Sequence, residues 1–182
     1  MAVLAGDALQ AEAFRLIAEA QDMSAQQRIE AVAVLSAACG GDGMVAGQVL
    51  DVEGLCSNAS EVKLLHSLKT GAMLCAACEL GAVAADGDEK TREIAREYGS
   101  HIGLAFQVRD DMLDVIADEG EFGKPVGSDR EEGKVTFVDL LGLDVCAVLV
   151  DEETRKAGET LSDLPGSGFL LELAESLAKR RM

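Results

Sequence analysis

The stretch Phe106–Lys134 reads FQVRDDMLDVIADEGEFGKPVGSDREEGK and joins a helical half to a glycine-rich half. At about 100° per residue, Gln107, Asp110 and Asp114 fall on one face of a helix, with Asp111 at its flank. A helix that packs only for stability more often carries apolar residues along one stripe. This face is therefore predicted to hold a charged ligand.

Small and basic residues extend the pattern in both directions. Upstream, Gly99 and Gly103 continue the stripe, and we interpret them as leaving room beside the carboxylates. Downstream, the loop supplies Lys124 and Lys134 with Asp129 between them. Its glycines would let the backbone fold closely over a ligand, although a solvated loop of mixed charge explains these residues equally well.

The composition of the 182-residue chain favours helices over sheets. Hydrophobic residues make up 48%, aromatic residues only 3%, and there are two prolines. A formal net charge of −17 argues against nucleic acid as a partner, because phosphate backbones are bound by clustered Lys and Arg. If the ligand is a phosphate or diphosphate, divalent cations would have to reverse the local field.

No uninterrupted apolar run reaches the roughly 20 residues of a membrane-spanning helix, and the start shows no signal-peptide pattern. We therefore expect a cytoplasmic protein without stable membrane insertion. The five cysteines, an odd number, suit reduced thiols better than disulfides. Cys75 and Cys78 form a CxxC inside a helical run, where packing is a better explanation than metal or redox use.

Apolar periodicity predicts helices throughout and no strand of useful length. Ser24 and Gln27 form a capping box, Ser60 is the predicted N-cap of a long helix, and Gly81 is its predicted stop. The predicted helices cover residues 2–20, 24–40, 44–55, 60–80, 88–116, 144–161 and a last segment around 169–177, with a short apolar piece at 136–141. The prediction is an all-α bundle that forms a single domain over residues 1–182.

Asp110 and Asp114 lie one helical turn apart, so their carboxylates could share a Mg²⁺ that also bridges phosphate oxygens. Both lie near the C-terminal end of the helix, where the macrodipole disfavours negative charge and a bound cation would offset the cost. Acidic triplets near helix ends are also common as solvated faces, and that alternative stays open.

A lysine in an apolar setting adds a second candidate. Lys69 sits in LHSLKTGAMLCAA, where its ammonium must reach solvent or find an anionic partner. Gln48 and Asp51 are interpreted as helix-surface residues. His66 and His101 are isolated in the sequence and are assigned no catalytic role.

Six stretches, taken together and in this order, resemble the motifs of the short-chain polyprenyl diphosphate synthases, most closely the bacterial farnesyl and geranylgeranyl diphosphate synthases. They are LAGDAL (4–9), GMVAGQVLD (43–51), HSLKTGAML (66–74), GLAFQVRDDMLD (103–114), GKPVGSD (123–129) and GKVTF (133–137). The resemblance implies an all-helical isoprenoid-synthase fold and a homodimer. The implied reaction is the Mg²⁺-dependent condensation of an allylic diphosphate, dimethylallyl or geranyl, with isopentenyl diphosphate to farnesyl or geranylgeranyl diphosphate.

The resemblance also implies a role for each matching residue. The metal ligands would be Asp110, Asp111 and Asp114, and the catalytic residues Lys69, Thr70 and Gln107. The substrate-binding residues would be Lys69, Lys124, Lys134, Gln107, Phe106 and Asp129. The glycines of the stripe would make space for the prenyl tail.

One departure from the family pattern affects the expected activity. The first aspartate-rich motif of the family precedes LAGDAL, and the sequence contains no such motif. We therefore expect the chain to correspond to the C-terminal two-thirds of the fold, truncated at its N-terminus. It should expose apolar surface that promotes a homodimer or higher association, and its catalysis alone should be impaired.

Two alternatives to an active synthase remain. The first is a non-catalytic diphosphate-binding or partner subunit of a complete prenyl synthase. The second, less favoured, is a helical metal-binding bundle unrelated to diphosphates.

Overall fold

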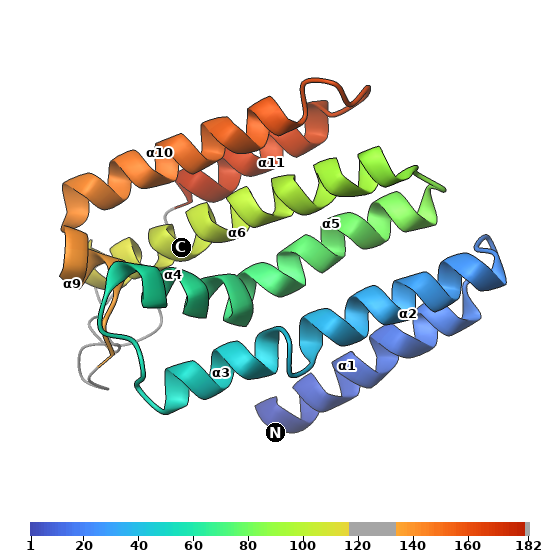
Figure 1. The fold of residues 1–182 in the computed structure, drawn as a ribbon, viewed down its shortest axis with the longest axis horizontal. Helices are drawn as coiled ribbons and strands as arrows, with labels where there is room; N and C mark the ends of the chain where they lie inside the picture. Colours follow the sequence, from blue (N-terminus) through green and yellow to red (C-terminus); the bar gives the residue numbers. More distant parts are fainter. Residues whose placement is uncertain (117–133, 181–182) are drawn as a thin grey trace.

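The computed structural model describes residues 1–116 and 134–180, and every regular element in these two ranges is helical. Long helices lie side by side, from α1 and α2 at one edge to α10 and α11 at the other (Figure 1). In chain order the elements are α1 (Ala2–Glu19), α2 (Ala25–Cys39), α3 (Met44–Val52), α4 (Ala59–His66), a π-helical turn η1 (Ser67–Gly71), α5 (Ala72–Ala84), α6 (Glu89–Ile116), α9 (Phe137–Leu141), α10 (Leu143–Thr160) and α11 (Gly168–Lys179).

Helix ends follow local capping chemistry, and one predicted cap and one predicted stop differ from the structure. The predicted capping box is confirmed: the Ser24 hydroxyl accepts from Gln27 N, and Ser24 N donates to the Gln27 side chain. The cap of α4 is Asn58 rather than Ser60, because Asn58 Oδ1 accepts from two successive backbone N–H groups at 3.1 Å. Helix α5 also continues through Gly81, which had been predicted as its stop.

Helix α6 is the centre of the fold and packs along α5 on one side and α10 on the other. Its N-terminal half lies in an apolar cluster with α10 and α11: Tyr98, Ile102, Ala157, Leu161 and Ala174. Its C-terminal half lies in a second cluster with α4, α9 and α10: Val62, Val108, Met112, Phe137, Val138, Cys146 and Val150. The two clusters hold α6 against its neighbours and fix the direction of its polar residues.

Glycines permit very close helix contacts beside the predicted site. A Cβ added to Gly99 would come within 2.6 Å of Cys75 Cα, and one added to Gly103 within 3.0 Å of Gly71 Cα. The interpretation that these two glycines leave room for a ligand is therefore wrong, because the backbone of α5 and η1 fills that space. They serve helix packing instead.

A buried polar cluster also joins α6 to α10. The Glu153 carboxylate accepts from Lys156 Nζ at 2.9 Å and lies 2.6 Å from His101 Nδ1. Burial pushes the pKa of Glu153 upward, but hydrogen bonds and charge from His101 and Lys156 outweigh it and leave the pKa below its ordinary value. Glu153 is thus a buried carboxylate stabilised by two neighbours.

The edge formed by α1 and α3 presents apolar side chains to solvent. Helix α1 buries none of its residues. The exposed large hydrophobic residues of the two helices are Val3, Leu4, Leu9, Leu16, Val45, Val49 and Val52. Such a row is typical of a surface that another polypeptide covers.

Two stretches, Ala25–Val52 and Ala59–Ala84, are long and apolar enough to cross a membrane by length and composition. The expectation that no segment has that length counted only uninterrupted apolar runs, so it is wrong on this measure. In the structure the first stretch is divided into α2 and α3 by a turn, and the second carries Lys63 and Lys69. Helices that pack inside soluble proteins pass the same test, so it is weak evidence for a membrane location.

Candidate active site

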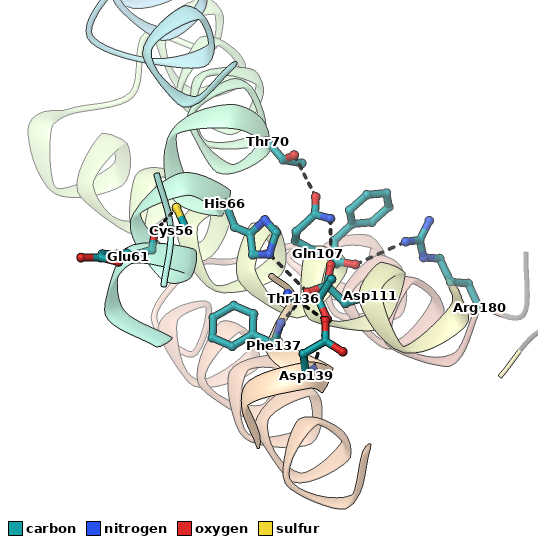
Figure 2. A network of polar contacts seen from close by, with 11 residues as sticks. Cys56, Glu61, His66, Thr70, Gln107, Asp111, Thr136, Phe137, Asp139 and Arg180 are labelled. Carbon is teal, nitrogen blue, oxygen red and sulfur yellow. Dashed lines mark hydrogen bonds and ion pairs between the residues drawn. The ribbon is translucent and has the colours of Figure 1, made fainter. Parts of the chain in front are cut away.

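The predicted site residues that the structure describes lie at one end of the bundle, where α4, η1 and α9 pack around the C-terminal half of α6. Figure 2 shows Thr70 pointing toward Gln107, and His66 and Phe137 converging on Asp111. These residues come from three parts of the sequence: the continuous α4–η1 segment, α6 and α9. Tertiary packing therefore brings them together.

A polar chain connects η1 to α6. The Thr70 hydroxyl donates to Gln107 Oε1 at 2.9 Å, and Gln107 Nε2 donates to Asp111 Oδ1 at 3.4 Å. The hydrogen bond from Thr70 orients both the hydroxyl and the Gln107 amide, because only the oxygen of the amide can accept. Thr70 and Gln107, each predicted as a catalytic residue, are thus hydrogen-bonded to each other.

Asp111 is the most enclosed member of the aspartate group, with a side chain only 3% exposed. Its Oδ2 accepts from the backbone N–H of Phe137 at 3.0 Å and lies 3.3 Å from His66 Nε2. The His66 ring packs against the Phe137 ring with centroids 5.4 Å apart. Asp111 therefore connects α9 and the end of α4 to α6 through these contacts. Its predicted role as a metal ligand stays a prediction.

Asp110 faces outward and meets the end of α11. Its side chain is 40% exposed, and its Oδ1 accepts from Arg180 Nη2 at 2.8 Å. The Arg180 guanidinium also lies 3.7 Å from the centre of the Phe106 ring, and the Arg180 carbonyl accepts from Arg109. A cation thus already occupies one side of this carboxylate.

Asp114 lies one helical turn beyond Asp110 and is buried. In residues 1–116 and 134–180, no group of three or more His, Cys, Asp or Glu side chains is arranged to hold a metal ion. The donor chemistry of Asp110 and Asp114 nevertheless fits Mg²⁺. This ion keeps several waters and usually binds through one or two carboxylates plus substrate phosphates.

Lys69 and Lys134, both predicted to bind a diphosphate, converge on one carboxylate. Asp51 Oδ2 lies 2.7 Å from Lys69 Nζ and 3.2 Å from Lys134 Nζ. Burial pushes the pKa of Asp51 upward, but the two lysines outweigh it and hold the pKa below its usual range. The predicted anionic partner of Lys69 is confirmed. The interpretation of Asp51 as a surface residue is wrong, since its side chain is only 9% exposed; Gln48 is exposed as expected.

Two predicted substrate-binding residues, Lys124 and Asp129, lie outside the described residues. The sequence analysis also missed three residues that the fold brings into the site: Asp51, His66 and Arg180. Each contacts a partner far along the chain, and no local spacing announces such a contact. Two of the quoted motifs held a signal, since GMVAGQVLD ends on Asp51 and HSLKTGAML begins on His66.

Comparison with known proteins identifies the family of this chain. Residues 1–161 match the family described as polyprenyl synthetase. The chain belongs to that family. It is 36% identical to the farnesyl diphosphate synthase of Haemophilus influenzae and 38% identical to that of Bacillus subtilis, over 99% and 98% of this chain. In both cases it spans 62% of the length of the relative.

Solved structures agree with this assignment. A polyprenyl synthase from Caulobacter crescentus, complexed with calcium and isoprenyl diphosphate, superposes with a TM-score of 0.87 over 99% of this chain and 66% of its own, at 28% identity. A geranyltransferase from Helicobacter pylori, complexed with magnesium and isoprenyl diphosphate, gives 0.80 over 97% and 58%, at 34% identity. The chain therefore has the all-α isoprenoid-synthase fold that its sequence predicts.

Proposed function

We propose that this chain carries the allylic-diphosphate half of a Mg²⁺-dependent prenyltransferase. The reaction would condense an allylic diphosphate, such as dimethylallyl or geranyl diphosphate, with isopentenyl diphosphate to farnesyl or geranylgeranyl diphosphate. The observation that carries the proposal is that a lysine and a group of carboxylates lie at the same end of the bundle. Lys69 adjoins Thr70, whose partner Gln107 lies one turn before the carboxylates of α6.

The first chemical step would be ionisation of the allylic C–O bond, with the electron pair leaving on the diphosphate. Lys69 and Lys134 would donate to its oxygens and stabilise the charge that develops as the bond breaks. The alkene of isopentenyl diphosphate then attacks the allylic carbon, a carbon–carbon bond forms, and loss of a proton restores the double bond. Inorganic diphosphate is the second product.

The Thr70–Gln107 pair would support the allylic cation. The Thr70 hydroxyl donates a hydrogen bond to Gln107 Oε1. The lone pairs of the Thr70 oxygen therefore remain for a positive centre. Fixed dipoles of this kind stabilise charge without having to reorganise during the reaction. A dry surrounding would keep water from reacting with the cation.

Asp110 and Asp114 would hold Mg²⁺, with water and diphosphate oxygens completing its coordination. The bound ion would neutralise part of the diphosphate charge, which a chain of net charge −17 would otherwise repel. Arg180 would have to share Asp110 with the ion or move away from it. Asp111 is the weakest candidate ligand, because its oxygens already contact three groups of the protein.

We further propose that residues 1–182 form one domain of a cytoplasmic protein without stable membrane insertion. The exposed apolar side chains of α1 and α3 support self-association, with a homodimer as the simplest closed arrangement. Nucleic acid is not among the proposed partners, since the net charge is strongly negative.

The test is binding and turnover by the purified 182-residue polypeptide. Calorimetry with Mg²⁺ and geranyl diphosphate should show binding that Lys69→Met removes. The matched control Lys90→Met, at an exposed lysine paired with Asp163, should leave that binding unchanged. Incorporation of labelled isopentenyl diphosphate should be far slower than in the Bacillus subtilis enzyme, because the proposed metal ligands among the described residues all come from α6. Binding that is equal in the two lysine variants would contradict the proposal, and turnover at the rate of a complete synthase would contradict the expected impairment.

The apolar surface of α1 and α3 also favours a second function, a non-catalytic subunit that joins a complete prenyl synthase. Such a subunit would bind the diphosphate without turnover and would form a heterodimer. Native mass measurement after mixing with the Bacillus subtilis enzyme separates the two functions. A heterodimer that stays inactive at this chain's own site supports the subunit, and a homodimer with turnover supports the enzyme.

A further inference from the structure

Helix α3 places a buried carboxylate directly against the two lysines of the proposed diphosphate site. Asp51 lies at the last turn of α3, and both ammonium groups contact the same oxygen, Oδ2. The two ammonium groups are therefore held close together although they come from η1 and from the segment before α9. Without an anion between them, two such charges would repel each other.

The position of Asp51 is fixed by the backbone. One turn earlier on α3, Gly47 packs against η1 so closely that an added Cβ would stand 2.2 Å from the backbone nitrogen of Lys69. The backbone that carries Asp51 is therefore held against η1, and an aspartate has two rotatable side-chain bonds where a lysine has four. The short side chain of Asp51 therefore acts as an anchor that holds the longer side chains of Lys69 and Lys134.

The lysines remain able to reach a ligand. The side chains of Lys69 and Lys134 are 33% and 29% exposed, against 9% for Asp51. An ammonium has three N–H donors, so one bond to Asp51 does not exhaust the capacity of Lys69. Asp51 is on the protein side of the pair, and the exposed parts of the lysines are on the solvent side.

We propose that Asp51 is a positioning residue for diphosphate binding: it holds Lys69 and Lys134 together so that both can donate to one diphosphate. This inference rests on the proposed function, because it assigns a task to the same lysine pair. It contrasts with a simple electrostatic role, in which Asp51 only competes with the ligand for the lysines. The two roles predict opposite signs when the charge of Asp51 is removed.

The test is calorimetric binding of inorganic pyrophosphate with Mg²⁺ to Asp51→Asn. Loss of the anchor should weaken binding by roughly tenfold, the effect of about one charge-assisted hydrogen bond. Asp51→Glu, which keeps the charge one methylene further out, should recover part of the affinity. The matched control Asp163→Asn removes an equal charge at an exposed ion pair and should change nothing. Equal or tighter binding by Asp51→Asn overturns the inference.

A second measurement needs no ligand. Labelling of Lys69 by an amine acetylating reagent, followed by peptide mass spectrometry, should be faster in Asp51→Asn than in the wild type, while thermal unfolding shows that both are folded. Unchanged labelling overturns the inference. If labelling rises but wild type binds no pyrophosphate, the proposed function fails and the anchoring of Lys69 by Asp51 stands, so the two failures are distinguishable.

Discussion

The two halves of helix α6 bury different kinds of side chain. The N-terminal half buries Tyr98 and Ile102 in an apolar cluster, and the Tyr98 hydroxyl donates to Leu170 O at 2.7 Å. The C-terminal half buries Asp111 and Asp114, and Asp111 is surrounded by bonds from three elements. One helix thus carries a half built for stability and a half in which stability depends on satisfying buried charge.

This difference teaches how to separate fold from function by mutation. A change in the apolar half should lower stability and leave ligand affinity intact in the molecules that remain folded. A change at an exposed carboxylate of the C-terminal half should lower ligand affinity and leave stability nearly unchanged. A change at Asp111 should separate its structural role from its predicted role as a metal ligand.

The largest effect is expected at Tyr98. Tyr98→Ala should lower the free energy of unfolding by about 3–5 kcal/mol, because it leaves a cavity in the tightest part of the cluster. Urea denaturation followed by circular dichroism measures this loss. Tyr98→Phe removes only the hydroxyl and should cost about 1–2 kcal/mol. An equal effect of the two variants would show that the hydrogen bond, not the packing, stabilises this half.

The next largest effect is expected at Asp110. Asp110→Ala should weaken Mg²⁺-dependent pyrophosphate binding roughly a hundredfold, about 2.7 kcal/mol, because the most exposed carboxylate of the group is lost. Unfolding free energy should change by less than about 1 kcal/mol, since the Asp110–Arg180 pair is partly exposed. Asp163→Ala is the control. Unchanged pyrophosphate affinity would remove Asp110 from the proposed metal site.

A smaller effect is expected at Asp111. Asp111→Asn replaces one acceptor by an NH₂ group, which cannot accept from both Gln107 and Phe137, so unfolding free energy should fall by about 1–2 kcal/mol. Pyrophosphate affinity should change far less than in Asp110→Ala. Equal losses of affinity in the two variants would identify Asp111 as a metal ligand, as the sequence resemblance implies.

The smallest effect is a pH dependence carried by Glu153. Its pKa in the folded protein is lowered, so its contribution to stability is complete above the ordinary Glu pKa near 4.5 and disappears as the pH falls through the lower folded value. Glu153→Gln should flatten the part of the stability curve below about pH 4.5. Parallel curves for the variant and the wild type would show that His101 and Lys156 do not stabilise this carboxylate.

Much of the fold follows from local sequence. Apolar spacing and the Ser24–Gln27 box locate α2, and the same logic finds α3, α6 and α10 to within a few residues. The errors were local as well: Asn58 rather than Ser60 caps α4, since both residue types cap helices and only backbone geometry selects one. The π-helical turn η1 has no period of its own in the sequence.

The site was predictable as a set of residues and not as a set of contacts. The spacing of Gln107, Asp110 and Asp114 follows from helix geometry alone. The bond from Asp110 to Arg180 depends on how α11 returns to α6, which no local pattern encodes. The stripe glycines show the same limit, because small residues indicate either empty space or a very close neighbour, and only packing distinguishes them.

The turn η1 has a consequence for single-residue deletions in this chain. A π-helical turn accommodates one extra residue within a helix, and each residue of an α-helix corresponds to about 100° of rotation. Removing one residue between Ser67 and Gly71 would let the wide turn close to an ordinary α-helical turn, so α5 would keep its phase relative to α4. The backbone of Cys75 would then still face Gly99. A single codon lost here would therefore be absorbed within the helix, whereas the same loss inside α5 would rotate every later residue of that helix by about 100°.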